Sequence, residues 1–280
     1  MNAVSAQLQF IAADQTGDAP YDYDLRLPAA PGGQHVPKVE VQVRDARAHK
    51  DLGLKTSGFE LVHAPSAVVD FYEHESVMAT YYEESKALAK KLTGAHTAFT
   101  FDHIIREPDG QLSAGGTDGS QRRSGSKAGG GYINSVHMDY TDNTTWDRYL
   151  SLHGEVVPQA EHVYALNFWR PISDTVDDHP LAVCDARTVS QADLQEVNVF
   201  GYGASNYSWY DIGIETFSVA ASDRHCWYYY PGMTPDEVLI IKSYDSAGVV
   251  GTTCPHGSFA HPDPQGIARR SIELRVLCFC

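Results

Sequence analysis

Apolar and polar residues alternate with a period of two in several short segments, which is typical of half-buried β-strands. The alternation is cleanest at residues 39–43, where three valines are separated by Glu and Gln. The segment 98–101 has the same character and either ends there or continues through 102–106. Further strands are expected at residues 163–169, 207–214, 226–230, 238–244 and 271–278.

Helical spacing of apolar residues is strongest at residues 76–92, and Gly94 follows as a stop signal. A shorter helix is expected at 144–152. Ser190 is expected to be the N-cap of a short helix, with Asp193 three positions later as the carboxylate partner of the cap. Many short strands with few helices, gathered early in the chain, predict a mainly β jelly roll with helical decoration.

The chain divides into an N-terminal extension, residues 1–38, and one domain, residues 39–280. The extension is rich in Pro, Gly, Asp and Ala, so we expect it to be partly irregular and order to begin near residue 39. Residues 110–131 are rich in glycine and almost free of apolar side chains, which predicts a loop that does not pack. Its place before residue 137 is compatible with a lid or with an ordinary flexible loop.

Composition excludes some partners. Lys and Arg number 21 against 36 Asp and Glu, a net charge of −15, which argues against nucleic acid and anionic membranes as partners. The five cysteines show no spacing typical of a disulfide framework or a zinc ribbon, and no apolar stretch approaches about 18 residues. We therefore expect a cytoplasmic protein with a small-molecule substrate, and leave its oligomeric state open.

The chemistry begins with His137 and Asp139. Side chains two positions apart on an extended segment point to the same side, so both can reach one metal ion. His256, in Cys-Pro-His, completes a two-His, one-carboxylate triad, which leaves about three octahedral positions of Fe(II) open for a cosubstrate and dioxygen. The sequence thus predicts that His137, Asp139 and His256 hold iron and form the catalytic centre.

A 2-oxoacid could occupy two of the open positions, and the far carboxylate of 2-oxoglutarate needs a fixed cation. Arg269 lies 13 residues after His256 and is the first choice. Ser271 shares its strand face and offers a hydroxyl to the same carboxylate. Arg275 lies six positions after Arg269, so alternation places it on the same strand face, and it is the alternative. Sequence alone does not decide between the two arginines.

Other residues have weaker claims. Tyr140, Asn167 and Arg170 are candidate contacts for the substrate. Asp102 and His103 are adjacent, so on a strand they face opposite ways and are expected to be structural. Two rival functions remain: a cupin-like metal-dependent isomerase or hydrolase with the same triad, and a non-catalytic β-barrel binding protein.

Longer stretches carry a family resemblance. They include Asn-Phe-Trp-Arg-Pro-Ile at 167–172, Pro-Leu-Ala-Val-Cys-Asp at 180–185, residues 237–245, Pro-His-Gly-Ser-Phe at 255–259 and Arg-Ser-Ile-Glu-Leu-Arg at 270–275. Together the chain resembles the hydroxylase/desaturase family related to the cephalosporin 7α-methoxylase component, which includes gibberellin desaturase-like enzymes. The resemblance covers most of the chain after residue 38.

This resemblance implies a non-haem Fe(II)- and 2-oxoglutarate-dependent oxygenase on a double-stranded β-helix, with dioxygen as second cosubstrate. It assigns the iron to His137, Asp139 and His256. The expected reaction is oxidation of an unactivated C–H bond by hydroxylation, desaturation or ring closure. The substrate would be an amino acid derivative or a natural-product intermediate of secondary metabolism.

Overall fold

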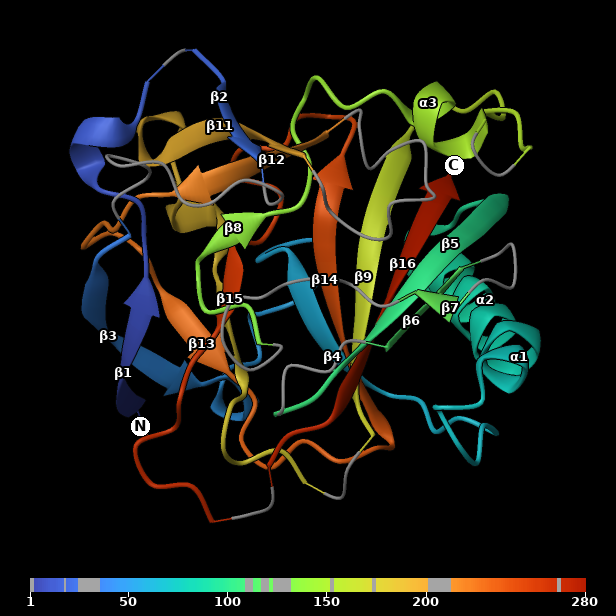
Figure 1. Cartoon of the computed structure of the whole chain (residues 1–280), viewed down its shortest axis with the longest axis horizontal. Coiled ribbons are helices and arrows are strands. Elements are labelled where there is room, and N and C mark those ends of the chain that lie inside the picture. The colour runs from blue at the N-terminus through green and yellow to red at the C-terminus, as the bar shows by residue number, and fades with distance from the viewer. Residues whose placement is uncertain are drawn as a thin grey trace.

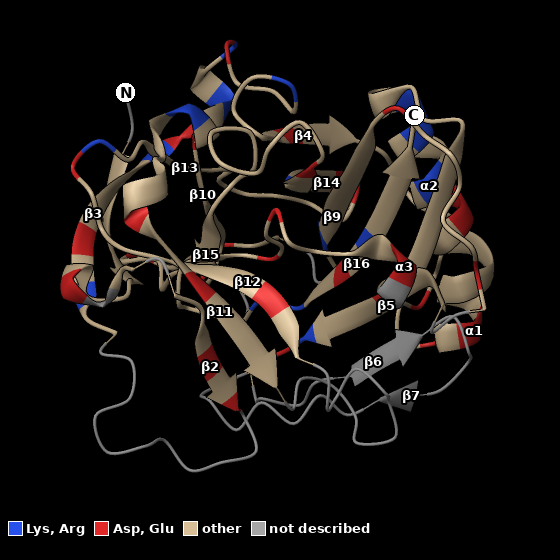
Figure 2. Ribbon diagram, turned by 90° about the horizontal axis from the view of Figure 1, so that it is seen from above, with Lys and Arg blue, Asp and Glu red and all other residues tan. Residues whose placement is uncertain are grey.

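Two curled β-sheets face each other and make up most of the molecule (Figures 1 and 2). The computed structural model describes residues 3–17, 19–24, 36–108, 113–116, 121–122, 132–151, 154–172, 175–200, 213–265 and 268–280. Within these residues the sheets contain nine and seven strands. The predicted mainly β double-stranded β-helix is confirmed, since a mixed sheet and an antiparallel sheet face each other and the helices are few.

The nine-stranded sheet has the order β1-β3-β13-β10-β15-β8-β12-β11-β2. Its strands are β1 (Ala3–Gln9), β2 (Tyr21–Asp24), β3 (Lys38–Asp45), β8 (His137–Met138), β10 (Leu181–Cys184), β11 (Leu194–Phe200), β12 (Ile214–Val219), β13 (Trp227–Tyr229) and β15 (His256–Ser258). Strands distant in sequence are therefore neighbours in space. In particular, β15 lies beside β8.

The seven-stranded sheet has the order β4-β14-β9-β16-β5-β6-β7. Its strands are β4 (Phe59–His63), β5 (Thr97–Arg106), β6 (Ser113–Gly116), β7 (Gln121–Arg122), β9 (Val163–Pro171), β14 (Glu237–Asp245) and β16 (Ser271–Phe279). The long central strands β14, β9 and β16 are nearly all buried, because the second sheet covers one face and helices cover the other.

The main helical segment packs on the outer face of the seven-stranded sheet (Figure 1). It consists of α1 (His74–Ser76), a π-helical turn η3 (Val77–Tyr81) and α2 (Tyr82–Thr93). Gly94 ends α2 in a left-handed conformation, φ 83°, as predicted. The other helices are α3 (Trp146–Ser151) and the short turns η1 (Ala13–Gln15), η2 (Ala46–Ala48), η4 (Ala186–Thr188) and η5 (Gln191–Asp193). None of the helices in the described ranges is long and apolar enough to cross a membrane.

Most predicted elements are confirmed with small changes of boundary. The expected strands at 39–43, 98–106, 163–169, 226–230, 238–244 and 271–278 correspond to β3, β5, β9, β13, β14 and β16. The helix expected at 144–152 is α3. Ser190 and Asp193 form the predicted capping box, but on the 3-10 turn η5. The strand expected at 207–214 lies almost wholly outside the described residues.

Order begins earlier than residue 39. Strand β1 pairs antiparallel with β3 over its whole length, from Ala3 opposite Arg44 to Gln9 opposite Lys38. Ala6 and Leu8 are buried in this sheet, whereas Ser5 and Gln7 between and before them are exposed, which is the alternation of a half-buried strand. Within the expected glycine-rich loop at 110–131, strands β6 and β7 form a hairpin beside β5. The rest of that segment lies outside the described residues, and its role as a lid stays a prediction.

Candidate metal centre

The sheet places the two predicted histidine ligands directly opposite each other. His137 on β8 and His256 on β15 are cross-strand partners, and their ring centroids are 4.6 Å apart. Such opposed side chains on one face of an antiparallel pair are the closest neighbours that a sheet offers. Asp139 follows β8 by one residue, so the alternation of the chain returns its side chain to the same side.

Three ligand atoms converge in this region. His137 Nε2 lies 3.8 Å from Asp139 Oδ1, and His256 Nε2 lies 3.7 Å from Asp139 Oδ2. One ligand atom from each residue lies within 4.8 Å of both others. This spacing suits three ligands around one ion, because metal–ligand bonds of about 2.0–2.2 Å place neighbouring ligand atoms about 3 Å apart once they close on the ion.

Backbone carbonyl groups orient both imidazoles. His137 Nδ1 lies 2.9 Å from Ser135 O, and His256 Nδ1 lies 3.1 Å from Cys254 O. A carbonyl oxygen only accepts, so each Nδ1 carries the proton and each Nε2 keeps its lone pair for a metal. Burial and the nearby His256 lower the pKa of His137, which favours the neutral form that binds a metal.

Asp139 is held as a carboxylate. Burial raises its pKa, but the two imidazoles, the Arg275 cation and the Asn167 amide outweigh burial and lower the pKa to about 2. Asn167 Nδ2 donates to Asp139 Oδ2 at 2.5 Å, and Ser243 Oγ donates to the same oxygen at 3.1 Å. The donor set is therefore two neutral imidazoles and one anion, which fits Fe(II).

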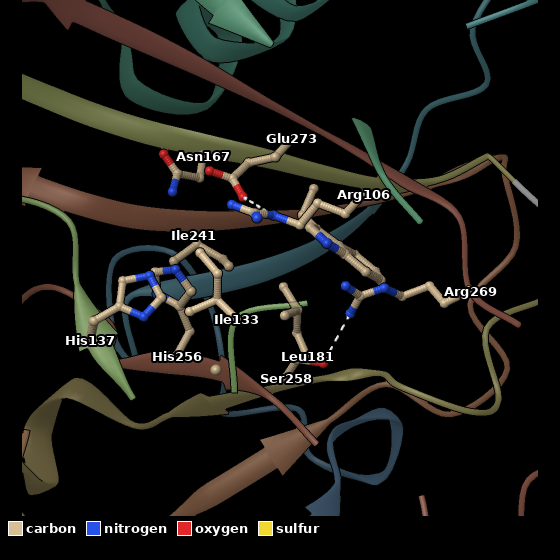
Figure 3. A pocket seen from close by; sticks show the side chains of 12 residues that line it. Arg106, Ile133, His137, Asn167, Leu181, Ile241, His256, Ser258, Arg269 and Glu273 are labelled. Carbon is tan, nitrogen blue, oxygen red and sulfur yellow. Dashed lines mark hydrogen bonds and ion pairs between the residues drawn. The ribbon is translucent and has the colours of Figure 1, made fainter. Parts of the chain in front are cut away.

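A pocket extends from the two histidines to Arg269 (Figure 3). It holds about 390 Å³ not filled by protein atoms, part of it open to solvent. Its walls between the two ends are formed by Ile133, Trp169, Leu181, Ile241, Gly257 and Ser258, and its charged side by Arg106 and Glu273. His137 and His256 thus lie at one end of the cavity and Arg269 at the other.

Arg269 is a buried cation with spare donor capacity. It is 0% exposed, and its Nη1 donates to His179 O at 2.5 Å and to Ser258 Oγ at 3.2 Å, while Nε has no partner among the described residues. Its guanidinium carbon lies 4.0 Å from the Tyr132 ring centroid and 5.5 Å from that of Trp169. Burial, helped by the Arg106 cation, lowers the pKa of Arg269 to about 9, so it stays charged at neutral pH.

The other two predicted cosubstrate residues are placed differently. Ser271 is buried, lies two positions after Arg269, and its hydroxyl has no partner within the described structure. Arg275 donates to both oxygens of Asp102 at 3.2 Å and to Glu273 Oε1 at 3.1 Å. Because carboxylates already engage Arg275, the geometry favours Arg269 as the partner of an added anion.

The three candidate substrate residues are not brought together. Asn167 lines the pocket and binds Asp139. Tyr140 packs against Trp146 and Tyr149, with centroids 4.9 and 6.0 Å away. Arg170 points to the opposite face of β9, where it donates to Pro235 O and Ala64 O. Neither Tyr140 nor Arg170 is among the residues that line the pocket.

The adjacent residues Asp102 and His103 on β5 face opposite sides of the sheet, as predicted. Asp102 faces Arg275, while His103 faces the helices and contacts His74 Nδ1 at 2.8 Å and the Tyr82 hydroxyl at 2.9 Å. Sequence reasoning missed Arg106, Tyr132 and Ser243 as residues of the site. Arg106 lies four positions after Asp102, so alternation could have placed both side chains on the same face of β5. Nothing in the sequence pattern indicated a role for Ser243.

Comparison with known proteins agrees with this geometry. Residues 8–279 match the family model described as oxidoreductase/YMDC permease-like domain. The hydroxylase/desaturase efuI of Hormonema carpetanum is 33% identical, over 85% of this chain and 83% of its own length. The Fe(II)/2-oxoglutarate-dependent dioxygenase nvfI of Aspergillus novofumigatus is 29% identical, over 86% and 83%.

A solved structure supports the same assignment. A variant of the iron and alpha-ketoglutarate-dependent endoperoxidase NvfI superimposes with a TM-score of 0.76 at 25% identity, covering 100% of this chain and 98% of that one. The narrower link to the cephalosporin 7α-methoxylase component stays a prediction. With a family match over nearly its whole length, the chain belongs to the oxidoreductase family that includes these hydroxylase/desaturase and Fe(II)/2-oxoglutarate-dependent dioxygenase enzymes.

Proposed function

We propose that His137, Asp139 and His256 hold Fe(II) and that Arg269 binds the far carboxylate of 2-oxoglutarate, for oxidation of an unactivated C–H bond in a small molecule. The observation that carries the proposal is the shared pocket, with the two histidines of the triad at one end and a fully buried arginine at the other. Within the described part of the chain no carboxylate pairs with the guanidinium of Arg269. Such a buried cation is costly, and an anionic ligand relieves that cost.

The charges around the pocket also favour this pair of ligands. Three arginines are balanced by three carboxylates: Arg106, Arg269 and Arg275 against Asp102, Asp139 and Glu273. A divalent cation together with a dicarboxylate preserves this balance, whereas either alone disturbs it. The proposal therefore includes cooperative binding of the metal and the oxoacid.

Fe(II) bound with 2-oxoglutarate and dioxygen supplies the oxidising power for C–H bonds. The protein's own contribution is positional. His137 and His256 present Nε2 because the carbonyls of Ser135 and Cys254 hold their Nδ1 protons. Arg269 fixes the orientation of the oxoacid, and the side chains of Ile133 and Ile241 form an apolar wall between the two ends.

Finer features remain proposals. Relatives include a protein named for aspirochlorine biosynthesis in Aspergillus oryzae, which supports a natural-product substrate. Hydroxylation, desaturation and ring closure all remain open for this chain. We also propose a cytoplasmic location, supported by five free cysteines, and no nucleic-acid or membrane partner, supported by the net charge of −15. Ser271 and Arg275 are proposed as supports of the oxoacid site through their strand face.

An anaerobic titration tests the proposal directly. Adding Fe(II) and then 2-oxoglutarate to the purified protein is expected to produce the weak visible charge-transfer band of a chelated complex. Dioxygen should then produce succinate, and pooled candidate metabolites should accelerate its release. Absence of the band together with no oxygen-dependent succinate would refute the proposal, and turnover without oxygen would favour a metal-dependent isomerase or hydrolase instead.

A further inference from the structure

Strand β14 contains a β-bulge beside the metal centre. Lys242 pairs with Leu166 of β9 and Tyr244 pairs with Ala165, which are consecutive positions, so Ser243 is an extra residue in β14. β-Bulges interrupt the alternation of side chains and often redirect one of them next to an active site. Ser243 contacts the metal ligand Asp139, because its hydroxyl lies 3.1 Å from Asp139 Oδ2.

The bulge changes which residues share the outer face of the sheet. Lys242 and Asp245 are three positions apart, so on a regular strand they would point to opposite faces. Here Lys242 Nζ donates to Asp245 Oδ2 at 2.8 Å, and both side chains are less than 10% exposed. His162 Nε2 contacts Asp245 Oδ1 at 2.7 Å. This buried Lys242–Asp245 ion pair can form only if the extra residue is present.

The inner face receives Ser243. Its hydroxyl and the Asn167 amide nitrogen both donate to Oδ2 of Asp139, and both residues are 2% exposed or less. The amide nitrogen must face the carboxylate, because an ionised carboxylate only accepts. With two donors on Oδ2, the lone pairs of Oδ1 are the ones left for a metal.

We propose that Ser243 is a positioning residue for the metal ligand Asp139, and that the Lys242–Asp245 ion pair maintains the bulge that aims it. The inference rests on the proposed function, since it concerns the geometry of the same metal site. Ser243 and Asn167 together fix the rotation of the carboxylate, so that Oδ1, 3.8 Å from His137 Nε2, is the oxygen that remains for a metal. Groups that hydrogen-bond metal ligands in this way typically contribute about 10–100-fold to metal affinity.

The test is titration of metal-free protein with Co(II), followed by its visible absorption, because this readout does not depend on turnover. Ser243→Ala is expected to weaken Co(II) binding by about 10–100-fold. Ser243→Thr keeps the hydroxyl and should restore wild-type affinity, and Ser243→Cys, a weak donor of similar size, should fall between. Ser85→Ala is the matched control, because Ser85 is equally buried and its hydroxyl has no partner in the described structure.

The ion pair is tested in the same assay. Lys242→Met should weaken Co(II) binding in the wild-type background but change it little when Ser243 is already Ala, because both changes remove the same contact. The inference would be overturned if Ser243→Ala and Ser243→Cys bound Co(II) with wild-type affinity. It would also be overturned if the effects of Lys242→Met and Ser243→Ala on Co(II) affinity were additive. The proposed function would stand in either case. Failure of the wild-type protein to bind Co(II) would instead remove the metal site on which both depend.

Discussion

Tyr132 contacts Arg269 in two ways. The guanidinium carbon lies 4.0 Å from the centroid of the tyrosine ring, and the tyrosine hydroxyl donates to Arg269 O at 2.6 Å. Tyr132 also contacts the His179 ring, with centroids 4.7 Å apart and the planes tilted by 35°. The proposed oxoacid-binding arginine is therefore fixed at both its backbone and its side chain before any ligand arrives, which lowers the entropy lost on binding.

Removing the ring of Tyr132 should weaken 2-oxoglutarate binding. In Tyr132→Leu the cation–π contact is lost, and we expect a loss of up to about 2 kcal/mol in affinity, measured as the anaerobic dissociation constant from the charge-transfer band. Tyr132→Phe keeps the ring and loses one hydrogen bond, so a loss of about 1 kcal/mol is expected.

Metal affinity serves as the internal control for these variants. Tyr132 lies at the Arg269 end of the pocket, so Co(II) binding without the oxoacid should match that of wild type. If Tyr132→Leu bound 2-oxoglutarate as tightly as Tyr132→Phe does, stacking would have no part in holding Arg269.

The two candidate arginines should respond differently to substitution. Arg269→Lys keeps the charge but loses the planar pair of donors, and Arg269→Met also loses the charge. We expect weaker 2-oxoglutarate binding for both, by about 2–5 kcal/mol for Met, since an anion would then be bound without its buried partner. The readout is again the anaerobic dissociation constant.

Arg275→Met should instead reduce stability. It leaves the carboxylates of Asp102 and Glu273 without the cation they share, and breaking a buried ion pair in this way costs about 3–5 kcal/mol. Urea unfolding of the metal-free protein measures this. A large loss of oxoacid affinity in Arg275→Met with normal stability would reverse the assignment of the two arginines.

The three residues predicted as metal ligands lie close together in the structure, and alternation along the chain explains part of this. His137 and Asp139 share a face through simple alternation, and His256 follows Cys-Pro in a strand-like segment. Asn167 and Arg170 are three positions apart on β9 and lie on opposite faces of it, as alternation requires. In a strand of regular register, the face to which each side chain points can therefore be predicted from the alternation of residues alone.

Features that depend on long-range pairing were not predictable. β1 looks irregular by composition, but it is ordered because β3 supplies seven opposed residues from Lys38 to Arg44. The bulge at Ser243 arises from the register of β14 against β9, which no local pattern reports. Arg275 has the parity of Arg269, yet only the fold shows that Asp102 engages it.

Stability should fall in acid partly through Asp245. Burial raises its pKa, but Lys242, the Ala247 backbone N–H and His162 outweigh burial, so the folded-state pKa is lowered. A lowered pKa means that the carboxylate stabilises the fold above its unfolded pKa of about 3.9, and that this stability is lost as the pH falls through the folded pKa. Asp245→Asn should therefore be less stable at pH 7 and lose less on acidification.

The comparison requires free energies of unfolding of metal-free protein at pH 7 and at about pH 3. Only the difference between wild type and variant is interpreted, because other carboxylates titrate in both. Parallel acid slopes for the two proteins would show that the ion pair with Lys242 does not lower the pKa of Asp245.

Two glycines with the same backbone angle provide the last test. Gly58 and Gly94 both have φ 83°, where an L-residue is strained, but their surroundings differ. A Cβ at Gly58 would lie 3.0 Å from Thr252 O and 3.3 Å from Cys254 Cβ, whereas a Cβ at Gly94 would have no described residue within 4 Å besides its own helix and chain neighbours. Gly94→Ala should lower the free energy of unfolding by about 1 kcal/mol from strain alone, and Gly58→Ala should lower it by more, about 1–3 kcal/mol, from strain plus crowding.

The two substitutions should also differ in their effect on the metal site. Because Cys254 O holds Nδ1 of His256, Gly58→Ala should weaken Co(II) binding, and Gly94→Ala should not. Equal effects of the two substitutions on both stability and metal affinity would mean that the contact between Gly58 and Cys254 does not help to place His256.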